Sequence, residues 1–330
     1  DAMTLLMRTA DKTGAFSLVR STARAQRRAA AASPTGEPSA HALFASAYVF
    51  AKYYWPERAL PLLERARCRA EREQNWELEH ACRDGIGVVL KQLGRFRDSA
   101  EQIRLGLAFA KRTLNPQAQA TSLVNLAVSE TALGEYEAAA IHLEESADID
   151  AKFPRWPHRV YRYYNQADLA VETGRLDEAI DAYQRALALA SEMNVWQVVV
   201  IACAGLARVA WEKKLIGESR EWCVKMRAVL VGKEHALTER WPVESALAWD
   251  ACSRGKGAEA VARLRVVLRE LSRRDADQWL RLRLETVRVS EEVAGKRSTA
   301  EREELRATAQ RFGASAIVAA AQEIGATSED

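Results

Sequence analysis

The sequence predicts an all-α protein, an α-solenoid of about eight helix-turn-helix hairpins. A turn motif recurs at a spacing of 40 residues in QLGRF, ALGEY and ETGRL, where a glycine stands two residues before an apolar or aromatic residue. Self-similarity at a period of about 20 to 50 residues is typical of solenoids and repeat arrays. Between these turns, apolar residues fall at helical spacing, as Leu123, Leu126 and Ala127 do. Glycine and proline number only 16 and 8, and the alternating pattern of β-hairpins is absent.

The turns define the elements in chain order. Glycine suits the left-handed cap that ends a helix, and an acidic residue such as Glu137 favours the first turn of the next helix. The same spacing reaches TGAF and Tyr54 upstream and Lys214 downstream, and then slips by one residue. Each unit is therefore a helix, a short turn and a second helix, with predicted turns near residues 14, 54, 94, 134, 174, 214, 255 and 295.

Small residues recur where the two helices of a unit are expected to cross. Ala139 and Ala179 each follow a turn glycine by five residues. Helices that pack closely need small side chains at the contact. We therefore expect Ala179 to lie at the crossing of its hairpin.

We expect one superhelical domain over residues 1–330, because repeat units bury their apolar faces only against their neighbours. The chain is also expected to be a fragment of a larger protein. It has no apolar run long enough to span a membrane and no charged-then-apolar leader, which predicts a cytoplasmic location. The five cysteines include no CxxC pair and are interpreted as core residues in a reducing compartment.

Motifs for catalysis, cofactors or metals are missing. No phosphate-binding GxxxxGK[ST] loop occurs, and the five histidines form no HExxH pair. We therefore expect no enzymatic activity, no cofactor and no metal ion. Although the net charge is only +3, arginines crowd the C-terminal part at Arg263, Arg265, Arg269, Arg273, Arg274, Arg281, Arg283 and Arg288. Interspersed glutamates favour a solvated helix face over a nucleic-acid partner.

The repeated units resemble tetratricopeptide (TPR) repeats. The resemblance rests on the turn glycines, on the alanine that follows them, and on a small residue in the first helix at Gly87, Ala127, Ala167 and Ala207. It is strongest from about residue 80 to 230, and it implies a right-handed superhelix. The unit is longer than the common repeat of about 34 residues, which leaves HEAT or armadillo repeats of about 40 to 47 residues as an alternative.

The resemblance also implies a ligand-binding groove on the concave face. It suggests that an asparagine about nine residues before the turn glycine could grip a peptide backbone, and Asn125 and Asn165 occupy that place. An amide offers both a donor and an acceptor. A peptide, a protein partner or a small polar ligand would suit the other candidate groove residues, which are Lys91, Tyr161, Tyr164, Asp168, Arg208 and Trp211.

Long repeats of this kind are similar to the sensor domains of large bacterial signalling ATPases and transcriptional activators of the MalT and AfsR type. The resemblance implies a non-catalytic binding module within a larger signalling or transcriptional regulator. The alternative is a stand-alone peptide receptor or a scaffold for protein assembly. Neither the nucleotide-binding domain nor the DNA-binding domain of such regulators is present in this stretch.

Overall fold

The computed structural model describes residues 24, 28, 38–52, 55–153, 158–233, 239–272, 275–295 and 298–323. These residues contain fifteen α-helices and no strand, which confirms the all-α solenoid. In chain order the helices are α3 (Ala40–Lys52), α4 (Pro56–Arg72), α5 (Trp76–Gln92), α6 (Phe96–Arg112), α7 (Pro116–Leu133), α8 (Tyr136–Lys152), α9 (Arg159–Glu172), α10 (Leu176–Glu192), α11 (Trp196–Glu212), α12 (Ile216–Leu230), α13 (Trp241–Cys252), α14 (Gly257–Leu271), α15 (Ala276–Ala294), α16 (Thr299–Phe312) and α17 (Ser315–Glu323).

Left-handed residues end the first helix of each described hairpin from α5 onwards. The φ angle is positive at Gly94, Gly134, Gly174, Lys214, Gly255 and Gly295. At the first of these turns, the N–H of Arg95 donates to the carbonyl of Leu90 at 2.9 Å, which satisfies a carbonyl that the helix end would leave unpaired. The predicted turns near residues 14 and 54 lie outside the described residues.

Small residues lie where the helices of neighbouring hairpins meet. Ala139 and Ala179 are completely buried. On α11, a Cβ atom added to Gly205 would come within 2.3 Å of the Tyr183 ring of α10. Tyr183 is itself 2 % exposed, so it has no room to retreat. Glycine at this position therefore allows α11 to approach α10 closely.

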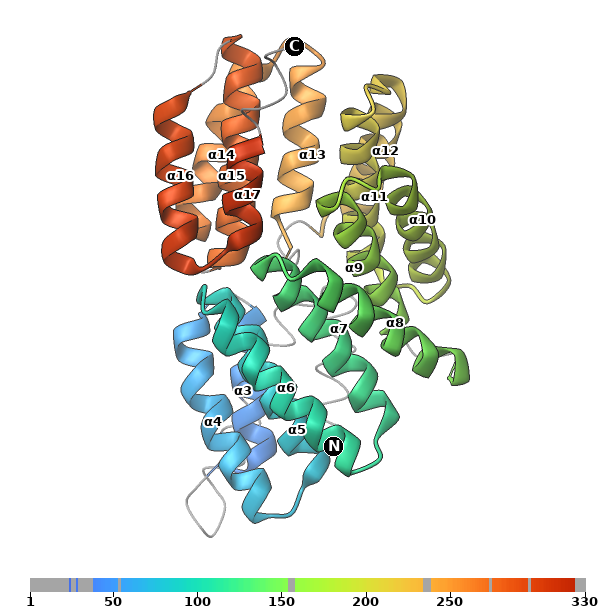
Figure 1. Ribbon diagram of the computed structural model, residues 1–330, viewed down its shortest axis with the longest axis vertical. Coiled ribbons are helices and arrows are strands. Elements are labelled where there is room, and N and C mark those ends of the chain that lie inside the picture. Colours follow the sequence, from blue (N-terminus) through green and yellow to red (C-terminus); the bar gives the residue numbers. More distant parts are fainter. Residues whose placement is uncertain are drawn as a thin grey trace.

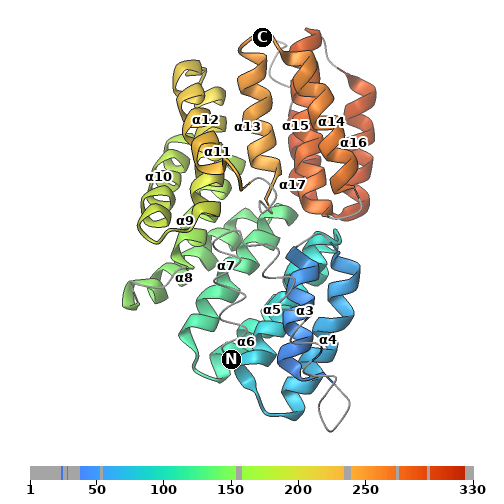
Figure 2. The same ribbon diagram turned by 180° about the vertical axis from the view of Figure 1, so that it is seen from behind.

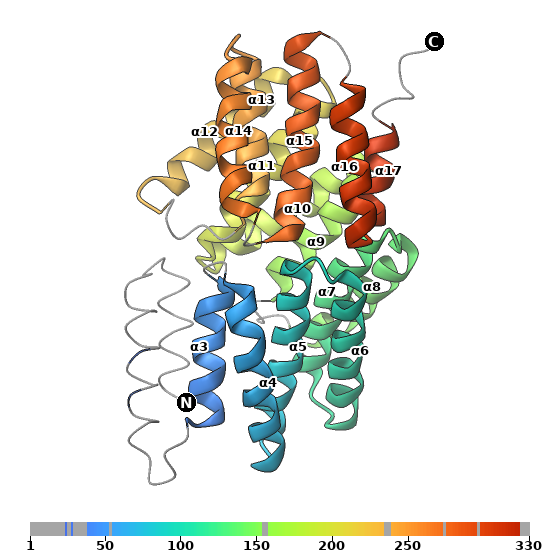
Figure 3. The same ribbon diagram turned by 90° about the vertical axis from the view of Figure 1, so that its left-hand side faces the viewer.

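The C-terminal hairpins pack back against the N-terminal ones, which nearest-neighbour packing did not predict. Figure 1 shows α13–α17 above α3–α6, with α7–α9 connecting the two parts, and Figure 2 shows the same arrangement from behind. In Figure 3, α15 lies above α5 and α17 lies above the end of α7. A single apolar cluster joins the two parts and includes Phe96, Leu126, Leu133, Leu280, Leu284 and Ile317.

The closure uses the turn ends of two N-terminal hairpins. A Cβ atom added to Gly94 would lie 2.3 Å from the Phe312 ring of α16, and one added to Gly134 would lie 3.5 Å from Ser315 of α17. The C-terminal helices therefore rest directly on the turns that the sequence motif marks. In the described part of the chain, no helix is both long and apolar enough to cross a membrane.

Candidate functional site

A polar stripe runs along one face of α9. Tyr161, Asn165, Asp168 and Glu172 are spaced by four, three and four residues, so their side chains share one side of the helix. Asp168 accepts a hydrogen bond from the hydroxyl of Tyr183, and burial raises the pKa of its carboxyl group. The stripe thus combines an aromatic ring, an amide and two carboxyl groups.

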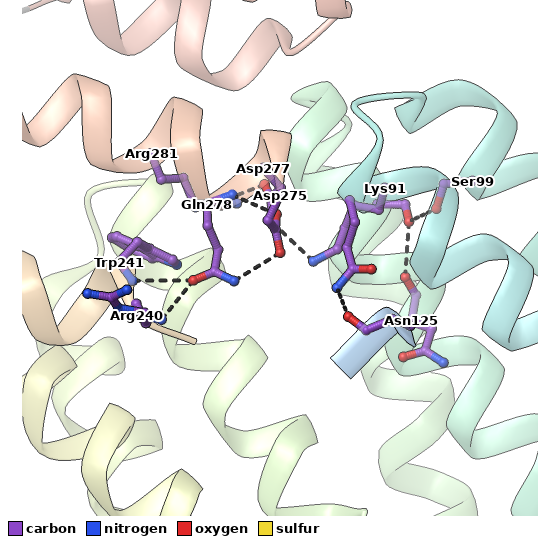
Figure 4. Close-up of polar contacts among 12 residues, drawn as sticks. Lys91, Ser99, Asn125, Arg240, Trp241, Asp275, Asp277, Gln278 and Arg281 are labelled. Atoms are coloured by element: carbon purple, nitrogen blue, oxygen red, sulfur yellow. Dashed lines mark hydrogen bonds and ion pairs between the residues drawn. The ribbon is translucent and has the colours of Figure 1, made fainter. Parts of the chain in front are cut away.

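Three ion pairs connect this stripe with helices far away in the sequence. The Glu172 carboxylate lies 3.2 Å from the guanidinium of Arg281, which also lies 3.2 Å from Asp277. Asp277 in turn pairs with Lys91 at 3.1 Å, as Figure 4 shows. These four residues join α9, α15 and α5. We call the surface formed by these residues together with Tyr164, Asn165, Asp168, Arg208 and Glu239 the inner surface.

The pKa values of Asp277 and Lys91 show that the attraction between the paired charges outweighs the effect of burial. Burial by itself would raise the pKa of Asp277, but Lys91 and Arg281 outweigh it and hold this pKa at about 2. Burial would likewise lower the pKa of Lys91, yet Asp277 outweighs that effect and raises it. Both groups are therefore charged at neutral pH. Since they lie on α15 and α5, their attraction stabilises the closed arrangement.

Aromatic rings flank the charged groups. The Trp241 ring has the Arg208 guanidinium 5.6 Å from its centroid and the Arg281 guanidinium at 5.4 Å. Such cation–π contacts hold each cation over the ring face. Trp211 stacks on Trp249, with 4.9 Å between the ring centroids. The side of the inner surface near α11 and α13 is therefore aromatic.

Gln278 fixes the start of α13 against α15. Its side-chain oxygen accepts the backbone N–H of Arg240 at 2.7 Å and that of Trp241 at 3.4 Å. Its side-chain nitrogen donates to Asp275 at 2.9 Å (Figure 4). Burial raises the pKa of Asp275 to about 6, and the nearby Asp277 adds to the shift. Gln278 thereby positions Trp241 between its two arginines.

The structure brings together four of the groove residues predicted from the sequence. Lys91, Tyr164, Asp168 and Arg208 all belong to the inner surface, and electrostatic interactions connect Tyr164 with Asp168 and Asp168 with Arg208. Lys91 and Arg208 already have partners, because Lys91 pairs with Asp277 and Arg208 pairs with Glu212 at 3.1 Å.

The remaining predicted residues differ in what they contact. The amide nitrogen of Asn125 donates to Asp84 at 3.4 Å. By contrast, the half-buried amide of Asn165 makes no hydrogen bond with the described residues. Tyr161 is 44 % exposed, and Trp211 is held by its stacking on Trp249. Of the two equivalent asparagines, Asn165 therefore has more hydrogen-bonding capacity left for a ligand.

Sequence reasoning missed Glu172, Asp277, Gln278 and the role of Arg281. Arg281 was assigned to a solvated face, and that interpretation is wrong, because its side chain is only 11 % exposed and pairs with two carboxylates. The spacing of Asp277 and Arg281 by four residues was a usable signal, since residues four apart meet on a helix. Nothing in the local sequence indicated the partners on α5 and α9.

A serine, a histidine and an aspartate also converge between α5 and α7. The Nε2 atom of His80 lies 2.8 Å from the Ser122 hydroxyl, which donates to Asp84 at 2.9 Å. Ser122 is completely buried, so a substrate cannot reach its oxygen. This hydroxyl also donates to the aspartate, whereas a nucleophilic serine gives its proton to histidine. These three residues therefore form a structural polar cluster.

Among the residues that the structure describes, no three or more histidine, cysteine, aspartate or glutamate side chains are grouped so that they could hold a metal ion. The three buried thiols, Cys82, Cys203 and Cys223, have raised pKa values because burial disfavours the thiolate. They pack as small apolar side chains.

Comparison with known proteins identifies the repeats. Residues 118–192, which include α7, α8, α9 and α10, match the model of the tetratricopeptide repeat family. This part of the chain therefore consists of TPR repeats. This result favours the TPR assignment over HEAT or armadillo repeats. No curated protein matches the sequence.

Solved structures share the fold of this chain at low sequence identity. A Rap protein in complex with Competence and Sporulation Factor has a TM-score of 0.58 at 14 % identity, covering 78 % of this chain and 76 % of that one. The apo form of RapI has a TM-score of 0.51 at 12 % identity, covering 77 % and 96 %. A STAND protein with a TPR sensor from Pyrococcus horikoshii has a TM-score of 0.53 at 12 % identity, covering 86 % and 44 %.

Proposed function

We propose that this TPR chain is a non-catalytic module that binds a peptide or a segment of a partner protein along its inner surface. The observation that carries the proposal is the polar stripe of α9, where Asn165 and Asp168 lie on one helix face beside Tyr164. The Asn165 amide is half-buried and makes no hydrogen bond with the described residues. This amide can therefore offer both its donor and its acceptor to a ligand.

An extended peptide can satisfy this stripe in a way that is independent of its sequence. The Asn165 amide donates to one peptide carbonyl and accepts one peptide N–H. Tyr161, which is 44 % exposed, and the partly exposed Trp211 offer apolar area to the peptide's side chains. This division gives affinity through the backbone and specificity through the side chains.

The wider proposal is that the module senses a signal within a larger cytoplasmic regulator. The similarity to the STAND protein supports it, since 86 % of this chain overlays on 44 % of a protein described as having a TPR sensor. The Rap complex supports a signalling factor as the kind of ligand. A stand-alone peptide receptor or an assembly scaffold is the second candidate, because the same inner surface would serve it.

Peptide-display selection on the purified chain tests the proposal. Selected peptides are expected to bind the wild-type protein and to lose about 0.5–1.5 kcal/mol of binding free energy for each neutral hydrogen bond removed by Asn165→Ala. Asn125→Ala is expected to have a smaller effect, since its amide already contacts Asp84. Calorimetric titration measures both affinities.

A control substitution on the outer face makes the experiment specific. Gln184 is exposed on α10, so Gln184→Ala should leave the affinity unchanged. Circular dichroism should show equal helix content in all variants, because alanine is the better helix former. If the selected peptides bind the Asn165→Ala and wild-type proteins equally well, the inner surface is not the binding site and the proposal is wrong.

A further inference from the structure

The inner surface carries more negative than positive side chains. Its described carboxyl groups belong to Asp168, Glu172, Glu239 and Asp277. The neighbouring Asp275 adds a fifth. Its described cations are Lys91, Arg208 and Arg281. The structure therefore leaves an excess of acceptors facing this surface.

The cations are already engaged elsewhere. Lys91 pairs with Asp277, and Arg281 bridges Asp277 and Glu172. Arg208 donates through Nε to Glu212 at 3.1 Å. Within the described part of the chain, neither Asp168 nor Glu239 has a cation within ion-pair distance. Asp168 is partly buried and lacks the cation that carboxylates at such sites usually have, whereas Glu239 is exposed.

The hydroxyl of Tyr164 lies close to the same carboxyl groups. Tyr164 is only 5 % exposed, and its hydroxyl makes no hydrogen bond with the described residues. The hydroxyl lies close enough to Asp168, Glu239 and Arg281 to interact electrostatically with all three. The Tyr164 ring also packs 5.8 Å from the ring of Tyr183, whose hydroxyl already donates to Asp168. The ring of Tyr164 is thus held in place, and its hydroxyl is available to bond a ligand.

We propose that Tyr164, Asn165, Asp168 and Glu239 form a subsite for a cationic nitrogen group, the side chain of a lysine or arginine in an extended peptide. This inference rests on the proposed function and names the ligand's chemistry. A primary ammonium brings three donors and a guanidinium brings five, and neither has an acceptor. Such a group matches a site that presents two carboxyl groups, an amide oxygen and a hydroxyl oxygen.

The arrangement also explains why a cation from outside fits better than one from the chain. Lys91 of α5 is paired with Asp277 of α15, and Arg281 of α15 is paired with Glu172 of α9. Their shared partner Asp277 is the most strongly stabilised carboxylate of the group, with a pKa near 2. Lys91 would have to leave this favourable pair to reach Glu239. A ligand cation meets no such competition.

Three labelled peptides test the inference by fluorescence anisotropy. The first alternates alanine with three lysines, the second carries acetyl-lysine in their place, and the third carries glutamate. We expect the lysine peptide to bind at least about tenfold more tightly than the acetyl-lysine peptide, which has the same length but no charge. The glutamate peptide should not bind.

Substitutions at the subsite should remove this preference. Asp168→Asn removes the charge but keeps an acceptor for the Tyr183 hydroxyl. Glu239→Gln removes the charge of an exposed side chain and keeps its length. The double variant should bind the lysine peptide about tenfold more weakly. Glu144→Gln with Asp148→Asn removes the same charge from the outer face of α8 and should leave binding unchanged. Tyr164→Phe, which deletes one hydroxyl, should weaken binding severalfold.

Three results would overturn the inference. Equal binding of the lysine and acetyl-lysine peptides would show that no cationic group is recognised. An equal loss in the α8 control variant would show that the attraction is long-range and not located at the subsite. Spermidine added at the concentration of the peptide should compete poorly, and strong competition would overturn the assignment to a peptide. If the acetyl-lysine peptide binds as well and Asn165→Ala weakens both, the cation subsite fails while the proposed function stands.

Discussion

Arg281 and Glu172 lie 109 residues apart in the chain, yet their side chains form an ion pair of 3.2 Å that fixes α15 to α9. Both side chains are largely buried, with 11 % and 14 % of their surface exposed. Together with the Lys91–Asp277 pair, this contact holds the C-terminal hairpins against the N-terminal ones. The closed arrangement therefore depends on a small number of charged side chains at the inner surface.

Removing Arg281 should destabilise the closure. Arg281→Met leaves the carboxylates of Glu172 and Asp277 without a shared cation, and breaking a buried pair in this way costs about 3–5 kcal/mol. Chemical denaturation measures the loss, and small-angle X-ray scattering should show a larger radius of gyration. Arg283→Met on the same helix is the control, because its partner Glu304 is 71 % exposed and such pairs contribute less than about 1 kcal/mol. Equal losses in the two variants would refute the role of Arg281.

Alanine substitution at two glycines with the same backbone conformation distinguishes the cost of local backbone strain from the cost of disturbing the contact between the N- and C-terminal hairpins. Gly94 has a φ of 75° and Gly174 a φ of 73°, so alanine at either position should cost about 1–2 kcal/mol in backbone strain. Only at Gly94 would the added Cβ also meet Phe312, at 2.3 Å, whereas nothing lies within 4 Å at Gly174. Gly94→Ala should therefore be the more damaging by about 1–3 kcal/mol, measured from unfolding midpoints.

The excess cost at Gly94 should largely disappear when the ring of Phe312 is removed. In the Phe312→Ala background, the costs of Gly94→Ala and Gly174→Ala should differ much less, since the contact with the Phe312 ring is gone and only the Ala276 Cβ atom, at 3.2 Å, remains close to the added Cβ. If Gly94→Ala costs as much as before in that background, α16 does not rest on this turn.

A larger side chain at Ala179 tests whether this residue lies where the two helices of its hairpin cross. Ala179 is completely buried on α10, in the cluster that includes Tyr183 and Val198. Ala179→Leu should overpack it and cost about 1–3 kcal/mol. Ala228 is exposed on α12, and Ala228→Leu should change stability by less than about 0.5 kcal/mol. An unchanged unfolding midpoint for Ala179→Leu would show that the site has free space.

Stability should depend on pH through Asp84. Burial raises its pKa from 3.8 to about 7, although hydrogen bonds from Ser122 and Asn125 oppose the shift. The folded state therefore holds this proton more tightly than the unfolded state does. The contribution of Asp84 to stability is full below about pH 4 and is lost as the pH rises through about 7.

Asp84→Asn should remove this dependence. The variant should gain stability relative to the wild type as the pH rises from 4 to 8, by an amount on the order of a few kcal/mol. Thermal unfolding of both proteins across this range measures the difference. His80 lies beside Asp84 and has a pKa lowered to about 4 by burial, so it acts in the opposite sense in both proteins. A difference between the two proteins that does not change with pH would contradict the assignment.

The sequence by itself determined the repeat and its turns. Gly94, Gly134 and Gly174 mark helix ends because a left-handed cap is a local property of the backbone, which glycine adopts without steric cost. The apolar spacing between them fixed the helix type, since a helix places every third or fourth residue on one face. Buried alanines such as Ala139 and Ala179 followed from the same register. Local chemistry was sufficient for all of these features.

Only the tertiary structure decided which charged groups meet. Lys91 and Asp277 are 186 residues apart, and their contact depends on the small rotation that each hairpin adds to the superhelix. No single repeat encodes the sum of those rotations. The same is true of the two asparagines: Asn125 and Asn165 occupy equivalent positions, but Asn125 has Asp84 beside it, while Asn165 makes no hydrogen bond with the described residues. Equivalent residues acquire different roles because closure gives each repeat different neighbours.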